Sequence, residues 1–204
     1  DWSHYRSAFE QEAARLVGLP VHVNGAIDAR ILPSPRIELH DVEVGQAGRP
    51  PQVRAAKVEL ELGLGSLLRG QVRATELHLV TPQITVALDR SGAIDWPALS
   101  SSFRPDALTI SRLNVEDGRV ILADAASGVR VTLQKLWFNG VIRSFIGPFH
   151  GEGAFVVGDE LYGYRISGGR FEDGGLKLKL GIDPSNHPLT AEIEGTLGFD
   201  HSLP

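Results

Sequence analysis

The feature that most constrains the fold is a 36-residue internal repeat in which apolar and polar residues alternate. Residues 72–92, VRATELHLVTPQITVALDRSG, align without a gap over residues 108–128, LTISRLNVEDGRVILADAASG. Leu77 aligns with Leu113, and the apolar positions that follow also coincide. Alternation with a period of two is typical of a half-buried strand. Because one strand pair cannot bury its apolar face alone, we expect the copies to stack in one shared sheet.

Turn-forming residues occupy equivalent positions in the two copies of the repeat. Pro82 aligns with Gly118, and the pair Ser91-Gly92 aligns with Ser127-Gly128. Proline and glycine are common turn residues, so we expect each copy to be two strands joined at Pro82 or Gly118. The segment from Gly92 to Trp96 is then the next corner.

The alternation of period two runs from Pro20 to the end of the chain, with Gly or Asp-Gly at most of the joins. Turns spaced in this way predict an antiparallel meander of about ten to twelve strands. The apolar positions Ile37 and Leu39 are followed by Val42 and Val44, which have the opposite parity, and such a shift predicts a bulge or a bend. We expect residues 20–204 to form one repetitive β-sheet domain that is part of a longer chain.

The first 19 residues predict the one convincing helix. Ser3 is a suitable N-cap, and Gly18 and Pro20 end the helical pattern. An apolar face recurs at helical spacing, and its members are Tyr5, Phe9, Ala13, Leu16 and Val17. Two interpretations stay open: an amphipathic helix packed on the edge of the sheet, or a membrane-proximal helix.

A sheet of this kind has an apolar face that one helix cannot cover. A strand of ten residues is about 33 Å long. The sheet therefore either curls on itself or packs against a second sheet. If it curls into an open trough (a taco or partial barrel), its apolar face is a groove suited to interaction. The residues expected to line this groove are Val58, Leu60, Leu62, Leu77, Leu79, Ile84, Val86, Leu88, Leu113, Val115, Val120 and Leu122. The same residues would equally fill a closed core.

Composition and motifs argue against several classes of function. The chain is 42% hydrophobic and 22% charged, as a globular protein is, and its net charge is −5. No basic run exceeds two residues, which argues against nucleic-acid binding. The chain has no cysteine, its histidines are scattered, and GLGSLLRG at 63–70 is not a phosphate-binding loop. A catalytic pair formed by Asp89 and Asp95 has no supporting group nearby. We expect no enzyme activity, no cofactor and no metal site.

Two ordered sets of short motifs mark the N-terminal part of the chain. After the entry helix comes a proline corner, Leu32-Pro33-Ser34-Pro35, and then a strand with the spacing Leu39-His40-Asp41-Val42-Glu43-Val44. A second block has Leu67-Leu68-Arg69-Gly70, the step from Leu77 to Ile84, and a closing turn from Gly92 to Trp96. With these motifs the chain resembles the AsmA family of bacterial envelope proteins over about residues 1–130, although Asp95 replaces the asparagine common in the closing turn.

The resemblance implies a periplasmic location, an inner-membrane helix upstream of this segment, and a long β-structure that continues beyond it. The family is similar to TamB-type and chorein-type bridge-like lipid transfer proteins, which carry phospholipid acyl chains in a β-trough. Two functions therefore stay in view. One is a lipid-binding or lipid-transfer groove that supports outer-membrane biogenesis or envelope lipid homeostasis. The alternative is a structural or interaction module whose edge strand recruits an envelope partner by strand addition.

Overall fold

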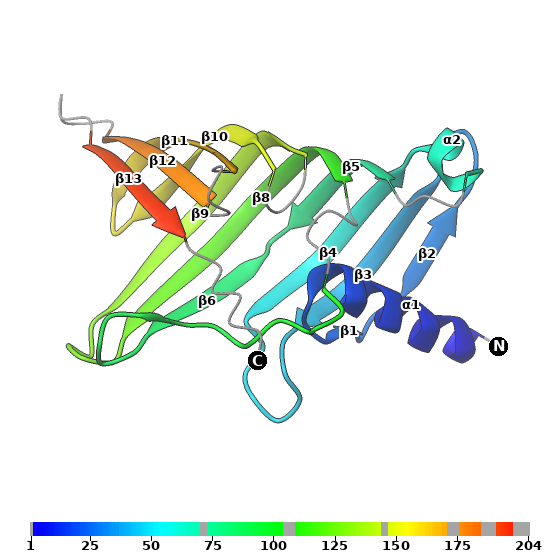
Figure 1. Cartoon of the computed structure of the whole chain (residues 1–204), viewed down its shortest axis with the longest axis horizontal. Coiled ribbons are helices and arrows are strands. Elements are labelled where there is room, and N and C mark those ends of the chain that lie inside the picture. Colours follow the sequence, from blue (N-terminus) through cyan, green and yellow to red (C-terminus); the bar gives the residue numbers. More distant parts are fainter. Residues whose placement is uncertain are drawn as a thin grey trace.

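A computed structural model describes residues 2–69, 73–103, 109–143, 147–170, 176–184 and 191–197. Within these ranges one sheet of 13 strands follows the N-terminal helix α1 (Trp2–Val17) (Figure 1). The strands are β1 (Val21–Val23), β2 (Ile27–Arg30), β3 (Arg36–Val44), β4 (Val53–Leu62), β5 (Arg73–Val80), β6 (Gln83–Leu88), β7 (Ile94–Asp95), β8 (Thr109–Asp124), β9 (Arg130–Ile142), β10 (Phe149–Val157), β11 (Glu160–Arg170), β12 (Leu176–Pro184) and β13 (Ala191–Leu197). A short helix, α2 (Leu64–Leu67), joins β4 to β5.

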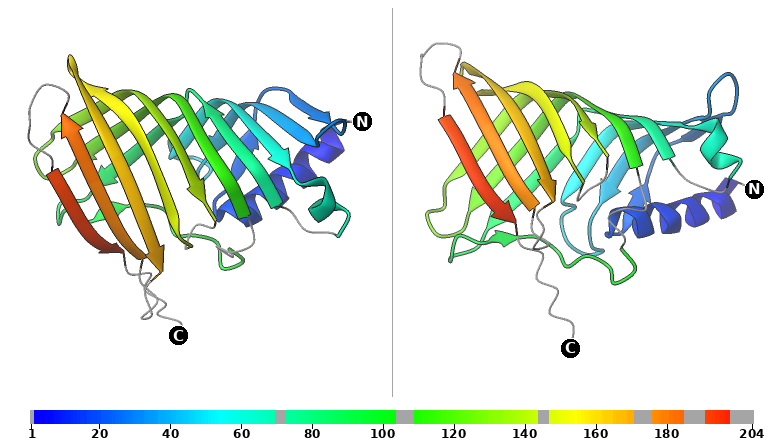
Figure 2. Two further views of the ribbon diagram at one scale, coloured as in Figure 1. Left: turned by 90° about the horizontal axis from the view of Figure 1, so that it is seen from above. Right: turned by 45° about the horizontal axis from the view of Figure 1, so that its top comes forward.

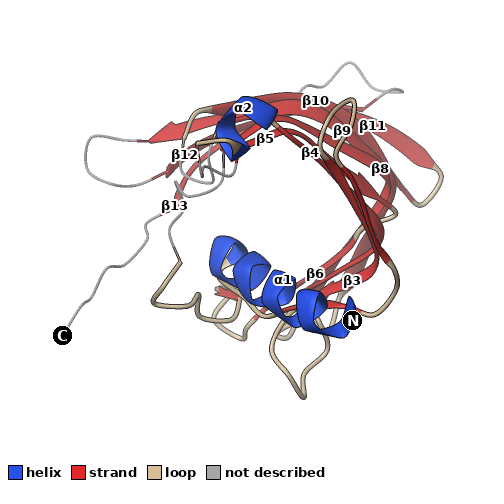
Figure 3. Cartoon of the chain, turned by 90° about the vertical axis from the view of Figure 1, so that its right-hand side faces the viewer, coloured by secondary structure: helices blue, strands red, loops and turns tan. Residues whose placement is uncertain are grey.

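The expected fold class is confirmed. The strand order runs β1-β3-β4-β5-β8-β9-β10-β11-β12-β13, with β2, β6 and β7 off this path. The two ends of the order, β1 and β13, do not pair, so the sheet is not a closed barrel. Seen end-on, the sheet curls into an arc with α1 on its inner side (Figure 3). Figure 2 shows the strands from β8 (green) to β13 (red) side by side in this sheet.

The internal repeat forms the centre of the sheet. β5 and β6 both pair with β8, and every residue pair is separated by 36 positions, such as Leu77 with Leu113 and Ile84 with Val120. The expected stacking of the copies is therefore confirmed. These two pairings are parallel, whereas the other pairings of the sheet are antiparallel.

The expectation that Pro82 and Gly118 are corners is wrong. β5 and β6 lie along the same strand, β8, in the same direction, so the chain passes Thr81 and Pro82 without reversing. Gly118 lies inside β8, where Leu136 of β9 opposes it. Both turn formers mark an interruption within a long strand, which is why the repeat resembles a hairpin in the sequence.

Parallel strands require a crossover, and the segment after β7 provides it. This segment passes the C-terminal end of α1, where the Ser100 amide donates a hydrogen bond to the Gly18 carbonyl at 2.8 Å (Figure 1). The Phe103 ring lies 2.9 Å from the place that a Cβ on Gly18 would occupy, and Gly18 has a φ of +84°. Glycine therefore allows both the helix end and the close passage of the crossover.

A row of interruptions bends the sheet. Asp41, Thr81, Asp117 and Lys135 are non-glycine residues with positive φ, at 52°, 46°, 50° and 49°. They lie near one another in the sheet, because the Thr81 amide bonds to the Glu116 carbonyl and the register of β8 with β9 shifts near Gly118. The predicted parity shift between Leu39 and Val42 coincides with Asp41. The shifted register of β8 with β9 near Gly118 is typical of a β-bulge. Bulges increase local twist, so we attribute the curl of the sheet partly to this interruption.

Helix α1 packs on the inner face near β1 and β3. Buried Val21, Val23, Leu39 and Val42 form a cluster with Phe9 and Val17 of the helix and with further half-buried residues. The Val23 amide donates a hydrogen bond to Glu10 Oε1 at 2.8 Å, and Arg6 donates to the Val23 carbonyl. These contacts hold α1 against the sheet.

Candidate functional site

The structure brings the predicted lining residues together on one face. Cross-strand neighbours share a face, and the predicted residues neighbour one another in transverse rows. The rows are Leu60–Leu77–Leu113, Val58–Leu79–Val115, Ile84–Val120 and Val86–Leu122. Leu62 opposes Ala74, and Leu88 opposes Asp124. Thr81 and Asp117 have positive φ, and the apolar positions change parity there, so we place the rows on both sides of these residues on the same face.

At the N-terminal end of this face the predicted residues serve as core. Leu62, which is 8% exposed, forms a buried cluster with Ala74 and Ile110. Leu16 of α1 packs against this cluster, as do Leu60 and Leu77. Val58 packs against the cluster beneath the helix. At this end, residues predicted to line the groove are therefore packed in or against the buried core.

The rest of the face is less covered. The remaining predicted residues belong to neither buried cluster; they are Leu79, Ile84, Val86, Leu88, Leu113, Val115, Val120 and Leu122. Most of them are half-buried, and Leu122 is 37% exposed. The accessible surface of the chain is 13152 Å², against roughly 9,300 Å² for a compact protein of this mass. The chain therefore exposes more surface than a compact protein of its mass.

The apolar face continues into β9–β12, beyond the residues that the sequence predicted. Gly140 opposes Gly151, Phe138 opposes Gly153, and Ile166 opposes Leu180. This extension escaped prediction because glycine contributes little to hydrophobic alternation. The signal was present, since the segment GEGAF at 151–155 places glycines at a period of two.

Aromatic rings lie over these glycines. A Cβ on Gly140 or Gly151 would lie within 2.5 Å of the Phe138 ring, and a Cβ on Gly168 would lie 2.4 Å from Phe149. Glycine thus lets each ring lie against the backbone of the neighbouring strands instead of projecting from the face. The rings supply apolar surface without filling the space above the sheet.

Tyr164 belongs to the same aromatic layer. Its ring stacks on Phe138 with centroids 6.3 Å apart, and its hydroxyl donates a hydrogen bond to the Trp137 carbonyl at 3.1 Å. Burial raises the pKa of Tyr164 to about 12, so the side chain is neutral at physiological pH. The layer is therefore uncharged.

The opposite face of the sheet is charged. Ion pairs join neighbouring strands, as between Arg36 and Glu61 at 3.1 Å and between Arg54 and Glu43 at 3.2 Å. The hydrogen bond from Lys57 lowers the pKa of Glu59, which favours the ionised carboxylate. One face is thus suited to water and the other to apolar contact.

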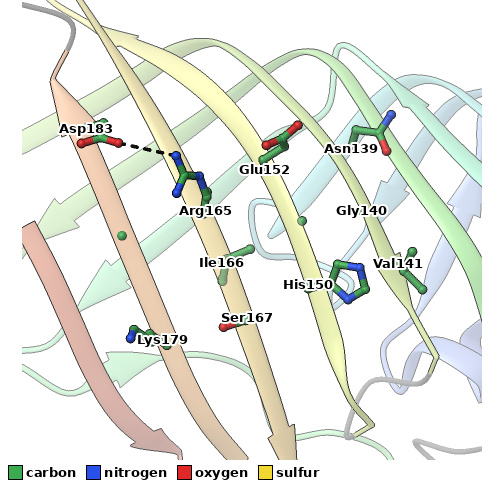
Figure 4. A pocket seen from close by; sticks show the side chains of 12 residues that line it. Asn139, Gly140, Val141, His150, Glu152, Arg165, Ile166, Ser167, Lys179 and Asp183 are labelled. Atoms are coloured by element: carbon green, nitrogen blue, oxygen red, sulfur yellow. Dashed lines mark ion pairs between the residues drawn. The ribbon is translucent and has the colours of Figure 1, made fainter. Parts of the chain in front are cut away.

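A shallow pocket of about 530 Å³ lies over β9–β12, lined mainly by polar side chains of the charged face (Figure 4). Arg165 and Asp183 form an ion pair there at 3.9 Å. None of the predicted lining residues contributes to this pocket, although Gly140, Gly151 and Ile166 of the extended apolar face border it. It therefore lies apart from the predicted groove residues.

The aspartates of the repeat stabilise turns. Asp89 Oδ1 accepts hydrogen bonds from the Ser91 amide at 2.7 Å and the Ala93 amide at 3.0 Å. The hydrogen bond from the Ser91 hydroxyl lowers the pKa of Asp89, and Ser127 does the same for Asp124. These bonds give the repeated Ser-Gly step and its aspartate a structural role.

The described part of the chain contains no group of three or more His, Cys, Asp or Glu side chains arranged to hold a metal ion. Neither of the helices in that part has the length and apolar character needed to cross a membrane.

Comparison with known proteins gives one match. The model of the AsmA family matches residues 1–140, which extend from α1 into β9. No curated protein and no solved structure matches the chain.

Proposed function

The chain belongs to the AsmA family of envelope proteins, and from this premise we propose that its apolar face is a groove for phospholipid acyl chains. The family assignment indicates a role in the envelope and in outer-membrane biogenesis. The proposal adds the cargo and the surface that holds it. In this account the chain is not an enzyme, and it supports lipid transfer or envelope lipid homeostasis by binding alone.

The observation that carries the proposal is the incomplete cover of a continuous apolar face. Helix α1 packs over the face near Leu62, whereas Leu79 and Val115 themselves lie outside both buried clusters. Each methylene of an acyl chain that leaves water contributes about 0.8 kcal/mol. A groove without polar recognition groups can therefore hold a lipid while the headgroup stays in water.

The proposal includes the place of this segment in the cell. Residues 1–19 would be a helix close to the inner membrane, and residues 20–204 would be a stretch of trough in a longer periplasmic protein anchored in that membrane. Within each row, neighbouring strands present similar apolar side chains at the strand spacing of about 4.8 Å. An acyl chain could therefore slide from strand to strand without a large barrier.

Native mass spectrometry of the purified chain tests the proposal. We expect co-purified phospholipid at near-stoichiometric level, or uptake of lipid after incubation with liposomes. A mass that stays free of lipid under both conditions would contradict the groove and indicate a closed apolar face.

A second candidate function rests on the edge of the sheet. β13 is the last strand in the order and pairs only with β12 among the described strands. An unpaired edge can accept a strand from a partner protein. A lipid-free chain that captures an envelope protein, and loses it when proline replaces Ile193, would favour this interaction module.

A further inference from the structure

One end of the sheet carries the three most exposed large apolar side chains among the described residues, with Leu64 beside them. Leu68 is 81% exposed, Leu32 is 72%, Ile31 is 71%, and Leu64 is 45%. We call these residues the apolar tip. They contribute nothing to the apolar face or to either buried cluster.

The tip residues come from two connections at the same end of the β3–β4 pair. Arg36 opposes Glu61 at the end of the ladder, and the Leu62 amide donates a hydrogen bond to the Pro35 carbonyl at 2.8 Å. The loop with Ile31 and Leu32 and the turn with α2 therefore leave the sheet side by side. In Figure 3, α2 and the N-terminal end of α1 both face the viewer, at this end of the molecule.

Exposed arginines surround the tip. Arg30 precedes Ile31, Arg69 follows Leu68, and the carbonyl of Arg73 accepts a hydrogen bond from Gly63 at the start of the same turn. Arg36, at the same end, pairs with Glu61, whereas Arg30, Arg69 and Arg73 form no ion pair within the part of the chain that the structure describes. This basic cluster stands out in a chain whose net charge is −5.

We propose that the apolar tip inserts into the interface of an anionic lipid bilayer, with Arg30, Arg69 and Arg73 at the level of the headgroups. Apolar side chains next to basic ones fit the two layers of such a surface. Each arginine near an anionic surface strengthens binding about fivefold. The charge of the cluster favours a bilayer over an apolar protein surface, and insertion does not require the groove to hold lipid.

Vesicle flotation of the whole chain tests this. We expect the chain to float with vesicles of phosphatidylglycerol and phosphatidylethanolamine, to float less in high salt, and to bind phosphatidylcholine vesicles weakly. The double variant Leu32→Asp with Leu68→Asp should lose at least about tenfold in partitioning, because two apolar side chains no longer insert.

Matched controls use apolar residues that are exposed elsewhere. Val129 is 56% exposed and Leu161 is 48% exposed, so the double variant Val129→Asp with Leu161→Asp should float like the unchanged chain. An equal loss in both double variants, or no flotation of the unchanged chain, would overturn the proposal.

One further pair of variants separates the tip from the groove. A tip variant should still carry lipid in native mass spectrometry, and Leu79→Asp should still float. Loss of flotation in the folded Leu79→Asp chain would place bilayer binding in the groove and overturn the role of the tip.

Discussion

Leu79→Asp is expected to abolish lipid binding and leave the chain folded. Leu79 lies between Val58 and Val115 on the apolar face, is half-buried, and belongs to neither buried cluster. A carboxylate there would have to lose water when an acyl chain enters, and its short side chain cannot reach solvent past the lipid. We expect affinity to fall by at least about a hundredfold, which corresponds to roughly 2.7 kcal/mol. Native mass spectrometry reports the bound lipid.

The control for this variant is Thr85→Asp. Thr85 lies between Ile84 and Val86 in sequence and therefore points to the charged face. The Thr85→Asp variant should therefore still bind lipid. If Leu79→Asp unfolds the chain in far-UV circular dichroism, position 79 belongs to a closed core, and if the lipid stays bound, the groove does not pass this residue.

Ala74→Asp should instead unfold the chain. Ala74 is 0% exposed and packs with Leu62 and Ile110 beneath Leu16 of α1. A carboxylate in this cluster would be buried without a partner, at a cost of about 3–5 kcal/mol. Because a domain of this size is stable by only about 5–15 kcal/mol, a large part of the population should be unfolded or α1 should detach.

Urea unfolding followed by circular dichroism measures this loss. Ala56→Asp is the matched control, because Ala56 lies in β4 and is exposed, and we expect it to change the free energy of unfolding by less than about 1 kcal/mol. Equal stability of the two variants would contradict the packing of α1 against the sheet.

The pairing of the repeat was predictable from the sequence, but the direction of the strands was not. The offset of 36 residues is the register of β5 and β6 on β8. Proline is common in turns, yet the chain passes Pro82 without reversing. The reason is that β8 is long enough to pair with both β5 and β6. Only the crossover beside Gly18 and Phe103 explains the parallel arrangement, and its contacts are distant in sequence.

The distinction between groove and core was also beyond the sequence. Leu60 and Leu79 have the same alternation and similar neighbours. They differ because α1 lies over the end of the face where Leu60 packs, and nothing near Leu60 in the sequence encodes that contact. The aromatic layer could not be predicted from the sequence for another reason. Gly151 and Gly153 carry no side chain, so the face at these positions is apolar only because Phe138 and Tyr164 lie against them.

The most direct test of the account is photo-crosslinking to lipid at neighbouring positions of β5 and β8. A photoreactive benzoylphenylalanine would replace Leu79 or Val115 on the apolar face, and His78 or Asn114 on the charged face. The account predicts crosslinks to phospholipid at Leu79 and Val115, and none at His78 and Asn114. Crosslinks at all four positions, or at none, would contradict a groove formed by this face.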